Sequence, residues 1–215
     1  MTRLVLHNFF RSSTSVRVRA ALNLKGLEYD YVAYALRSGA HHGAQHTALN
    51  PQGLVPTLVT EHGPLPQSLA IIEWLDEEYP APPLLPADAW GRARVRSLAH
   101  IMALDVHPVN NLRVLQYLER EFGADAAAQA KWFRTWAEPA MQAMETRLAA
   151  DRETGSFCHG DTPGLADLCL YAQVLNNTRF GIGTDDTPVI GRIFDACMAV
   201  PAFERAIPAN QPDAV

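Results

Sequence analysis

Four hydroxyl side chains stand in a row near the start of the chain, at Ser12, Ser13, Thr14 and Ser15. A short apolar run precedes them and a stretch with a helical apolar face follows, so they fall where a strand ends and a helix begins. Ser and Thr are preferred there because their oxygens accept hydrogen bonds from the first helical N–H groups. Four of them, with arginines at 11, 17 and 19, also suit an anion, which the helix dipole attracts. The stretch predicts a helix cap, an anion-holding site, or both.

Composition narrows the class of partner. The chain has 215 residues, 48% hydrophobic and 19% charged, with a formal net charge of -5. This length allows one large domain or two small ones, and nothing in the charge favours nucleic acid. No stretch approaches the roughly 20 apolar residues of a membrane span, and the N-terminus lacks the apolar region of a signal peptide. We expect a cytoplasmic protein with a small-molecule partner.

The cysteine and histidine residues indicate neither a disulfide nor a metal site. Cys158, Cys169 and Cys197 all lie in the C-terminal half, odd in number and without a Cys-x-x-Cys pair, so no disulfide is predicted. His42 and His46 have the spacing of a helical ligand pair, but no neighbouring Cys or carboxylate completes a set. No metal site is predicted.

The first eighty residues alternate strands and helices. Strands are expected at 4–6, 29–35 and 55–59, with helices at about 15–25 and 69–75. The first three elements form a βαβ unit. Pro56 requires an edge, a bulge or a cis bond, because it cannot donate to a central strand.

The pattern changes after a proline-rich linker. We expect domains at 1–80 and 88–215 with a linker at 81–87, and helices alone in the second domain. One helix should run from about 88 to 120 with a kink at Pro108, another from 124 to 150, and two shorter ones near 168–175 and 190–199. Asp167 should cap its own helix by accepting from the backbone N–H of Gly164. The polar tail from Pro208 is expected to be poorly ordered.

In this order of elements the chain resembles the cytosolic glutathione transferases: an α/β thioredoxin-like N-terminal domain followed by an all-α C-terminal domain. The hydroxyl run and the Asp-Val-His-Pro stretch at 105–108 resemble the zeta class more narrowly. The likeness continues through Asn-Pro-Gln at 50–52, Val-Pro-Thr-Leu at 55–58 and Gln-Ser-Leu-Ala-Ile-Ile-Glu-Trp-Leu at 67–75. Within that class, the stretches at 84–88 and 116–125 look most like the bacterial maleylpyruvate isomerases.

The resemblance implies an enzyme, a glutathione-dependent isomerase that converts maleylpyruvate or maleylacetoacetate to the fumaryl form. It implies catalytic roles for Ser12, Ser13 and Thr14, and a homodimer. Such a substrate is a dianion, and we expect the guanidinium groups of Arg11, Arg113 and Arg179 to bind its carboxylates. Glutathione would be bound by Ser12, Ser13, Thr14, Ser15, His41, Gln52, Val55, Pro56, Gln67, Ser68, His107, Asn110 and Asn111.

Two departures from the zeta pattern matter. Thr14 stands where many members have cysteine, and Gly164 stands where a capping Ser or Thr is usual. With no cysteine before residue 158, the thiol must arrive with glutathione. Two alternatives stay open: a general glutathione transferase acting in conjugation, dehalogenation or peroxide reduction, and a non-catalytic binding module of the same fold.

Overall fold

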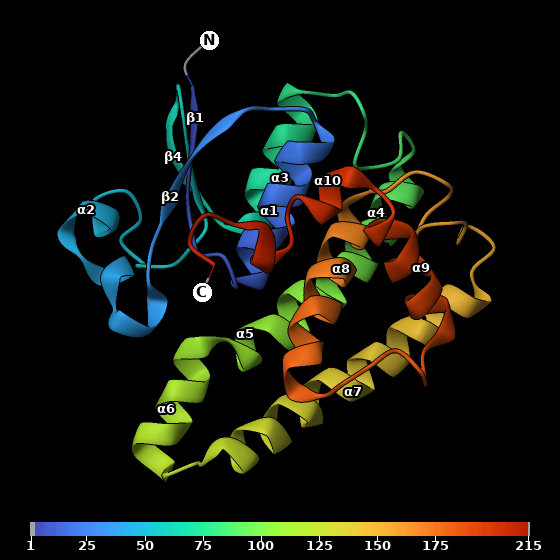
Figure 1. Cartoon of the computed structure of the whole chain (residues 1–215). Helices are drawn as coiled ribbons and strands as arrows, with labels where there is room; N and C mark the ends of the chain where they lie inside the picture. The colour runs from blue at the N-terminus through green and yellow to red at the C-terminus, as the bar shows by residue number, and fades with distance from the viewer. Residues whose placement is uncertain (1–2, 215) are drawn as a thin grey trace. The chain divides into compact units, whose positions relative to one another are not determined.

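Residues 3–214 are described by a computed structural model, in which the chain forms two compact units (Figure 1). The first unit runs to Leu84 and also contains the chain from Met198 onward, and the second is Leu85–Cys197. The C-terminal residues therefore join the first unit, whereas the expected second domain ran to the end of the chain. The reason is apolar burial: Ala202, Phe203 and Ala206 are buried, and their short helix contacts the first helix of the chain.

A four-stranded mixed sheet organises the first unit. Its strands are β1 (Leu4–Asn8), β2 (Tyr29–Ala33), β3 (Thr57–Thr60) and β4 (Gly63–Pro66), in the order β2-β1-β3-β4. β1 runs parallel to β2 and antiparallel to β3, which pairs antiparallel with β4. The Val55–Pro56 bond is cis and directly precedes β3. The predicted thioredoxin-like topology is confirmed.

Two helices cover one face of this sheet. Figure 1 shows α1 (Ser13–Leu24) and α3 (Ser68–Glu78) side by side there, and the two are in contact. Their core side chains include Val18, Leu22 and Ile71, which are fully buried with Leu6 and Leu58 of the sheet. The short helix α2 (Ala44–Thr47) lies in the long connection between β2 and β3.

The second unit consists of helices, as predicted. Its elements are α4 (Ala89–His100), a π-helical stretch (Ile101–Val106), α5 (His107–Asn110), α6 (Leu112–Phe122), α7 (Ala126–Ala150), α8 (Leu165–Asn177) and α9 (Pro188–Met198). The prediction of one helix from 88 to 120, kinked at Pro108, is wrong. The chain passes through a π-helical stretch and breaks at Asn111, whose backbone is extended and whose side chain accepts from Val114 N at 3.3 Å. A side-chain cap thus starts a new helix where apolar spacing alone suggested continuity.

The predicted cap at α8 is confirmed. One oxygen of Asp167 accepts from Gly164 N and the other from Cys158 N, each at 2.8 Å. Burial raises the pKa of Asp167, and these backbone hydrogen bonds oppose that shift. Asp167 therefore has a structural role, because each of its carboxylate oxygens accepts a backbone hydrogen bond.

The prediction of a poorly ordered tail from Pro208 is wrong for the described residues 208–214, and Val215 lies outside them. Helix α10 (Pro201–Glu204) and a 3-10 turn (Pro208–Asn210) precede Gln211, which is buried and donates to the carbonyls of Arg205 and Ile207, both at 2.8 Å. The polar side chain of Gln211 satisfies backbone acceptors, so the polar composition of this tail does not make it disordered.

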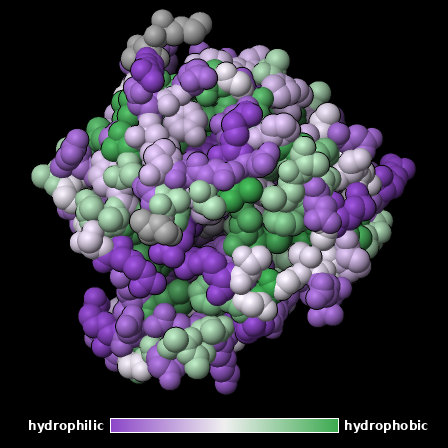
Figure 2. Space-filling view, in the orientation of Figure 1, coloured by the Kyte–Doolittle hydropathy of each residue, from purple (hydrophilic) through white to green (hydrophobic). Residues whose placement is uncertain are grey.

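The described part of the chain, residues 3–214, contains no helix both long and apolar enough to cross a membrane. Hydrophilic and hydrophobic residues are interspersed on the face that Figure 2 draws. The large apolar side chains with substantial exposure are Trp90, Leu104, Tyr117, Phe122 and Trp136.

A buried ion pair joins the C-terminal end of α1 to α3. Lys25 Nζ lies 2.7 Å from Asp76 Oδ1 and also donates to the carbonyl of Pro82, while Leu84 N donates to the same Asp76 oxygen. The side chain of Lys25 is fully buried. The pair thus fixes the ends of α1 and α3 to the chain that leaves the unit.

We expect Lys25→Met or Asp76→Leu alone to lower the free energy of unfolding by about 3 kcal/mol, because each leaves a buried charge unpaired. The double variant should lose less than the sum of the two by at least about 1 kcal/mol. Arg3→Met, which breaks the exposed pair with Asp30, is the control and should cost no more than about 0.5 kcal/mol. Strictly additive losses in urea denaturation would contradict the coupling.

Candidate functional site

The hydroxyl run lies at the start of α1, as the sequence predicts. Ser12 is the N-cap residue: its Oγ accepts from Ser15 N at 3.3 Å and lies 2.7 Å from Thr14 Oγ1. Ser13 and Ser15 are buried, whereas Ser12 and Thr14 are only partly covered. Two of the four hydroxyls are therefore open to a ligand.

Thr14 connects this run to the segment before β3. Its hydroxyl donates to the carbonyl of Val55 at 3.1 Å, just before cis-Pro56. Since a hydroxyl has one proton, Thr14 accepts in its contact with Ser12, and Ser12 is the donor there. The O–H of Ser12 is thus the one that can turn toward a bound anion without breaking the link to Val55.

The long connection between β2 and β3 is held by side chains that bind its own backbone. The Leu54 carbonyl accepts from Asn50 Nδ2 at 2.8 Å and interacts with His46 Nε2 at 3.1 Å. Gly53 has a φ of +60°, and a Cβ there would lie 2.6 Å from His42 Nδ1. Close approach and backbone conformation both require glycine at this position.

Gln52 and Gln67 meet at the start of α3. Gln67 Nε2 donates to Gln52 Oε1 at 2.9 Å, and both side chains are exposed. Gln67 is the only non-glycine residue with a positive φ, 73°, in the described chain, a conformation that costs of order 1–3 kcal/mol. Such strain is most often kept at functional sites. The buried Ser68 follows as the first residue of α3.

His41 has a polar atom without a partner inside the first unit. Its Nδ1 is buried and makes no hydrogen bond within the described chain. Burial lowers the pKa of His41, with further contributions from His42 and His46. A neutral His41 therefore offers a ligand either a ring N–H or a lone pair.

A cluster that sequence reasoning missed lies beside this loop. His7 Nδ1 is 2.9 Å from the hydroxyl of Tyr34, and the ring of Tyr34 lies 4.6 Å from that of the fully buried His46. Burial is the main cause that lowers the pKa of His7, and His46 adds to it. A histidine directly after the apolar run Leu4–Leu6, within the same strand, was the available signal. The described residues include no group of three or more His, Cys, Asp or Glu side chains able to hold a metal.

The three arginines flanking the run have different surroundings. Arg11 is partly covered, its guanidinium carbon 5.1 Å from the ring centroid of Phe10 and 5.9 Å from that of Phe9. Arg17 and Arg19 are buried in α1. Of the three, only Arg11 is accessible to a substrate.

The predicted site residues of the second unit have mixed positions. Asn110 is buried and donates to the carbonyl of Phe133 at 3.1 Å, and Asn111 caps α6, so both have structural partners. His107 is partly covered, and Arg113 is exposed on α6. Arg179 is exposed and donates to Asn176 Oδ1 at 2.9 Å.

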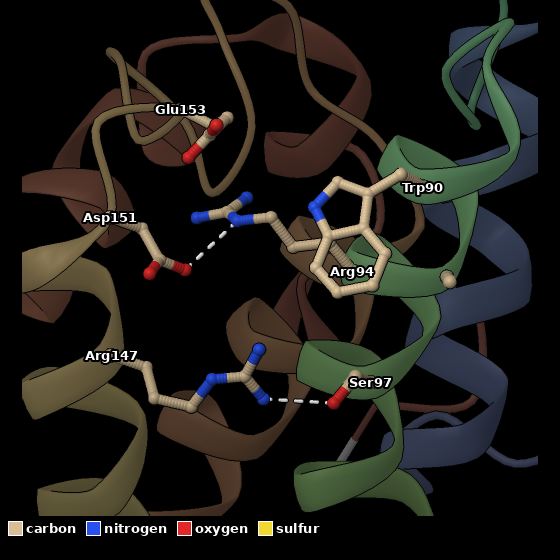
Figure 3. Close-up of a pocket in the computed structure, with 7 residues that line it drawn as sticks. Trp90, Arg94, Ser97, Arg147, Asp151 and Glu153 are labelled. Carbon is tan, nitrogen blue, oxygen red and sulfur yellow. Dashed lines mark hydrogen bonds and ion pairs between the residues drawn. The ribbon is translucent and has the colours of Figure 1, made fainter.

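The second unit has a cavity of about 320 Å³ that is lined by none of the predicted site residues. Figure 3 shows Arg94 and Arg147 pointing into it, Arg94 toward Asp151 and Arg147 toward Ser97. Arg94 also binds the Cys158 carbonyl at 2.8 Å and Thr154 Oγ1 at 3.0 Å. Its guanidinium is therefore employed in holding the loop after α7.

Comparison with known proteins agrees with the geometry of the first unit. Residues 11–78 match the family described as glutathione S-transferase, N-terminal domain. A maleylpyruvate isomerase of Ralstonia sp is 51% identical over 208 residues, 97% of this chain and 98% of the relative.

Two solved structures extend the likeness to the whole chain. One is a holo maleylpyruvate isomerase, described as a bacterial zeta-class glutathione S-transferase, at TM-score 0.96 and 50% identity, covering 98% of this chain and 100% of the other. The second is a maleylacetoacetate isomerase of Methylobacterium extorquens with bound malonate and glutathione, at TM-score 0.95 and 40% identity, covering 98% and 99%.

The mixed sheet, the cis-proline before β3 and the hydroxyl-capped α1 thus define a glutathione transferase fold. More specifically, the chain belongs to the zeta class, among the maleylpyruvate and maleylacetoacetate isomerases.

We predict that the first unit loses stability as the pH falls below about 6.5, the ordinary pKa of histidine. Because the folded-state pKa of His7 is lowered, the unfolded chain binds more protons between that lowered value and 6.5, and acid therefore favours unfolding. His7→Gln should make the unfolding free energy depend less on pH between about 7.5 and 5.5, one unit on either side of the ordinary histidine pKa.

The exposed His62 offers a matched control, and His62→Gln should keep the wild-type slope. If His7→Gln and wild type show equal slopes in urea titrations at each pH, the cluster is not the source of the acid sensitivity.

Proposed function

We propose that this protein is a glutathione-dependent cis–trans isomerase of a maleyl keto acid, the class that includes maleylpyruvate and maleylacetoacetate. The observation that carries the proposal is the partly exposed hydroxyl of Ser12 at the N-terminus of α1, linked to the Val55 carbonyl through Thr14. Its relatives of similar length carry the two isomerase names.

The residues of the first unit fit glutathione. Val55 before cis-Pro56 offers backbone groups to the cysteinyl part, as such segments do for an extended peptide. Gln67 and Ser68, at the start of α3, suit the γ-glutamyl end, where the helix N-terminus favours its carboxylate. Gln52 is already joined to Gln67, and Nδ1 of the half-buried His41, which has no partner within the described chain, suits a polar ligand group.

When bound, glutathione supplies a thiolate that adds reversibly to the conjugated double bond, so that the bond can rotate. An ordinary thiol has a pKa near 8.5, leaving about 3% thiolate at pH 7, and lowering it by ~2 units gives roughly three quarters. The Ser12 hydroxyl and the dipole of α1 stabilise that charge. Ser12 is the donor because the proton of Thr14 is engaged with Val55.

The chain's own cysteines do not suit this role. Cys158, Cys169 and Cys197 are all buried. Burial raises the pKa of Cys158 and of Cys197, and the nearby carboxylate of Asp167 adds to both shifts. Neutral, enclosed thiols are poor nucleophiles.

The substrate is a dianion, and guanidinium groups are the natural partners of its carboxylates because they can bind bidentately. We assign this role to Arg11 in the first unit and to Arg113 and Arg179 in the second. Their accessibility supports the assignment, as does malonate, a dicarboxylate, bound by the Methylobacterium relative. His107, Asn110 and Asn111 of the second unit stay candidates from the family resemblance alone, since Asn110 and Asn111 already have partners within that unit. We further propose that the protein is a cytoplasmic homodimer.

The first test of this function asks whether the reacting thiol comes from glutathione or from the protein. Isomerisation of maleylpyruvate or maleylacetoacetate should require added glutathione, and it should survive treatment of the native protein with iodoacetamide followed by fresh glutathione. The physical reason is that the three cysteines are buried. Turnover by dialysed protein without a thiol, or permanent loss of activity after alkylation, would contradict the proposal.

A second test concerns the hydroxyl that stabilises the thiolate. Ser12→Ala should raise the pKa of the bound glutathione thiol and slow turnover by roughly 10- to 1000-fold, the range for removing one preorganised donor. Thr60→Ala is the control, because the Thr60 hydroxyl serves the turn between β3 and β4, where it accepts from His62 N and donates to the Gly63 carbonyl, and this variant should leave that pKa unchanged. The ultraviolet absorbance of the thiolate, titrated against pH, measures the thiol pKa in both variants. If that pKa is unchanged in Ser12→Ala, Ser12 is not the residue that stabilises the thiolate.

A further inference from the structure

We infer that the C-terminal segment 206–213 fixes the turn that presents Arg11 and Ser12, and that Asp213 and Arg19 are positioning residues for the glutathione thiol. This inference rests on the proposed function. Figure 1 shows the segment, in red, ending beside β1 and the start of α1, all within the first unit.

Both backbone polar groups of Phe10 are held by this arrangement. Its N–H donates to Asp213 Oδ2 at 3.1 Å, and its carbonyl accepts from Arg19 Nη2 at 2.8 Å. Asp213 is 203 residues away in sequence, so the turn is held from the far end of the chain.

Arg19 joins the turn to the C-terminal segment directly. Its fully buried guanidinium donates to Asn8 Oδ1 at 2.8 Å, to the Phe9 carbonyl at 3.3 Å and to the Ala206 carbonyl at 3.0 Å. A buried charge is costly unless its donors are satisfied. The Arg19 guanidinium therefore depends on acceptors from the turn and from the C-terminal segment. Loss of that segment would remove the Ala206 carbonyl.

Asp213 is itself anchored on the sheet. Its second oxygen, Oδ1, accepts from the hydroxyl of Tyr31 in β2. Burial is the first cause that raises the pKa of Tyr31, and the hydrogen bond to Asp213 is the second, so Tyr31 stays a neutral donor. The carboxylate therefore bridges two donors, one on the sheet and one in the turn.

The turn is short enough to transmit this restraint. Ser12 N donates to the Phe9 carbonyl at 3.1 Å, which also accepts from Arg19, and Arg11 follows Phe10 directly. A displacement of about 1 Å at a catalytic group can cost of order 10²-fold in rate. A loose Phe10 would misplace the Ser12 hydroxyl while leaving the rest of the first unit folded.

The experiment compares four variants of the full chain: Asp213→Ala, Asp213→Asn, Tyr31→Phe and Asn23→Ala. Asn23→Ala is the matched control, because Asn23 Nδ2 donates to the Ala202 carbonyl at 2.9 Å and ties α1 to the same C-terminal region without touching the turn. The readouts are amide exchange of Phe10, the pKa of the bound glutathione thiol, its dissociation constant by calorimetry, and kcat and KM.

We expect Asp213→Ala to speed exchange of the Phe10 amide, to raise the thiol pKa by up to about one unit, and to lower kcat by about 10- to 100-fold. Glutathione affinity should change less than threefold, since Val55, Gln67 and Ser68 keep their places. Asp213→Asn should recover most of the loss, because its amide can still accept from Phe10 N and donate to Tyr31. Tyr31→Phe should lie between Asp213→Ala and wild type, and Asn23→Ala should match wild type.

Two results would overturn the inference: an unchanged thiol pKa and kcat in Asp213→Ala, or an equal loss in Asn23→Ala. Failure of the proposed function is distinguishable. A wild-type protein that binds glutathione but does not isomerise maleyl keto acids refutes that function, while amide exchange and the thiol pKa still decide whether Asp213 positions the turn.

Discussion

The first unit is built around a buried cation, the guanidinium of Arg19. It is fully buried, and it donates to the side chain of Asn8 and to three backbone carbonyls, those of Phe9, Phe10 and Ala206. Each acceptor must be held in place, because an unpaired buried charge costs several kcal/mol. This requirement fixes the end of β1, the turn into α1 and the C-terminal segment in one arrangement.

That arrangement explains why the hydroxyl run begins where it does. The turn ends at Ser12, whose N–H is bound to Phe9, and α1 starts at Ser13. Thr14 then reaches Val55, so the segment before β3 depends on the same turn. We propose Ser12 as the hydroxyl that faces glutathione, since Ser13 and Ser15 are buried and the proton of Thr14 is engaged with the Val55 carbonyl.

Local chemistry made much of this structure predictable from sequence. The strands, α1, the cap at Asp167 and the proline before β3 follow from apolar periodicity and from residues with one conformational role. The contact of Thr14 with Val55 spans 41 residues, and that of Phe10 with Asp213 spans 203. Such pairs leave no periodic signal, so the hydroxyl run could be predicted while the groups that orient it could not.

The errors have a common physical cause as well. The polar tail from Pro208 was predicted to be poorly ordered, yet the side chains of Gln211 and Asp213 satisfy backbone groups of the first unit. Asn111 likewise ends one helix and caps the next, where apolar spacing predicted a continuous helix. In each case a polar side chain binds backbone at a position that only the tertiary structure defines. In the site that we propose, the thiol belongs to glutathione, so the reaction would depend on side chains that hold hydrogen-bond donors in position around the sulfur.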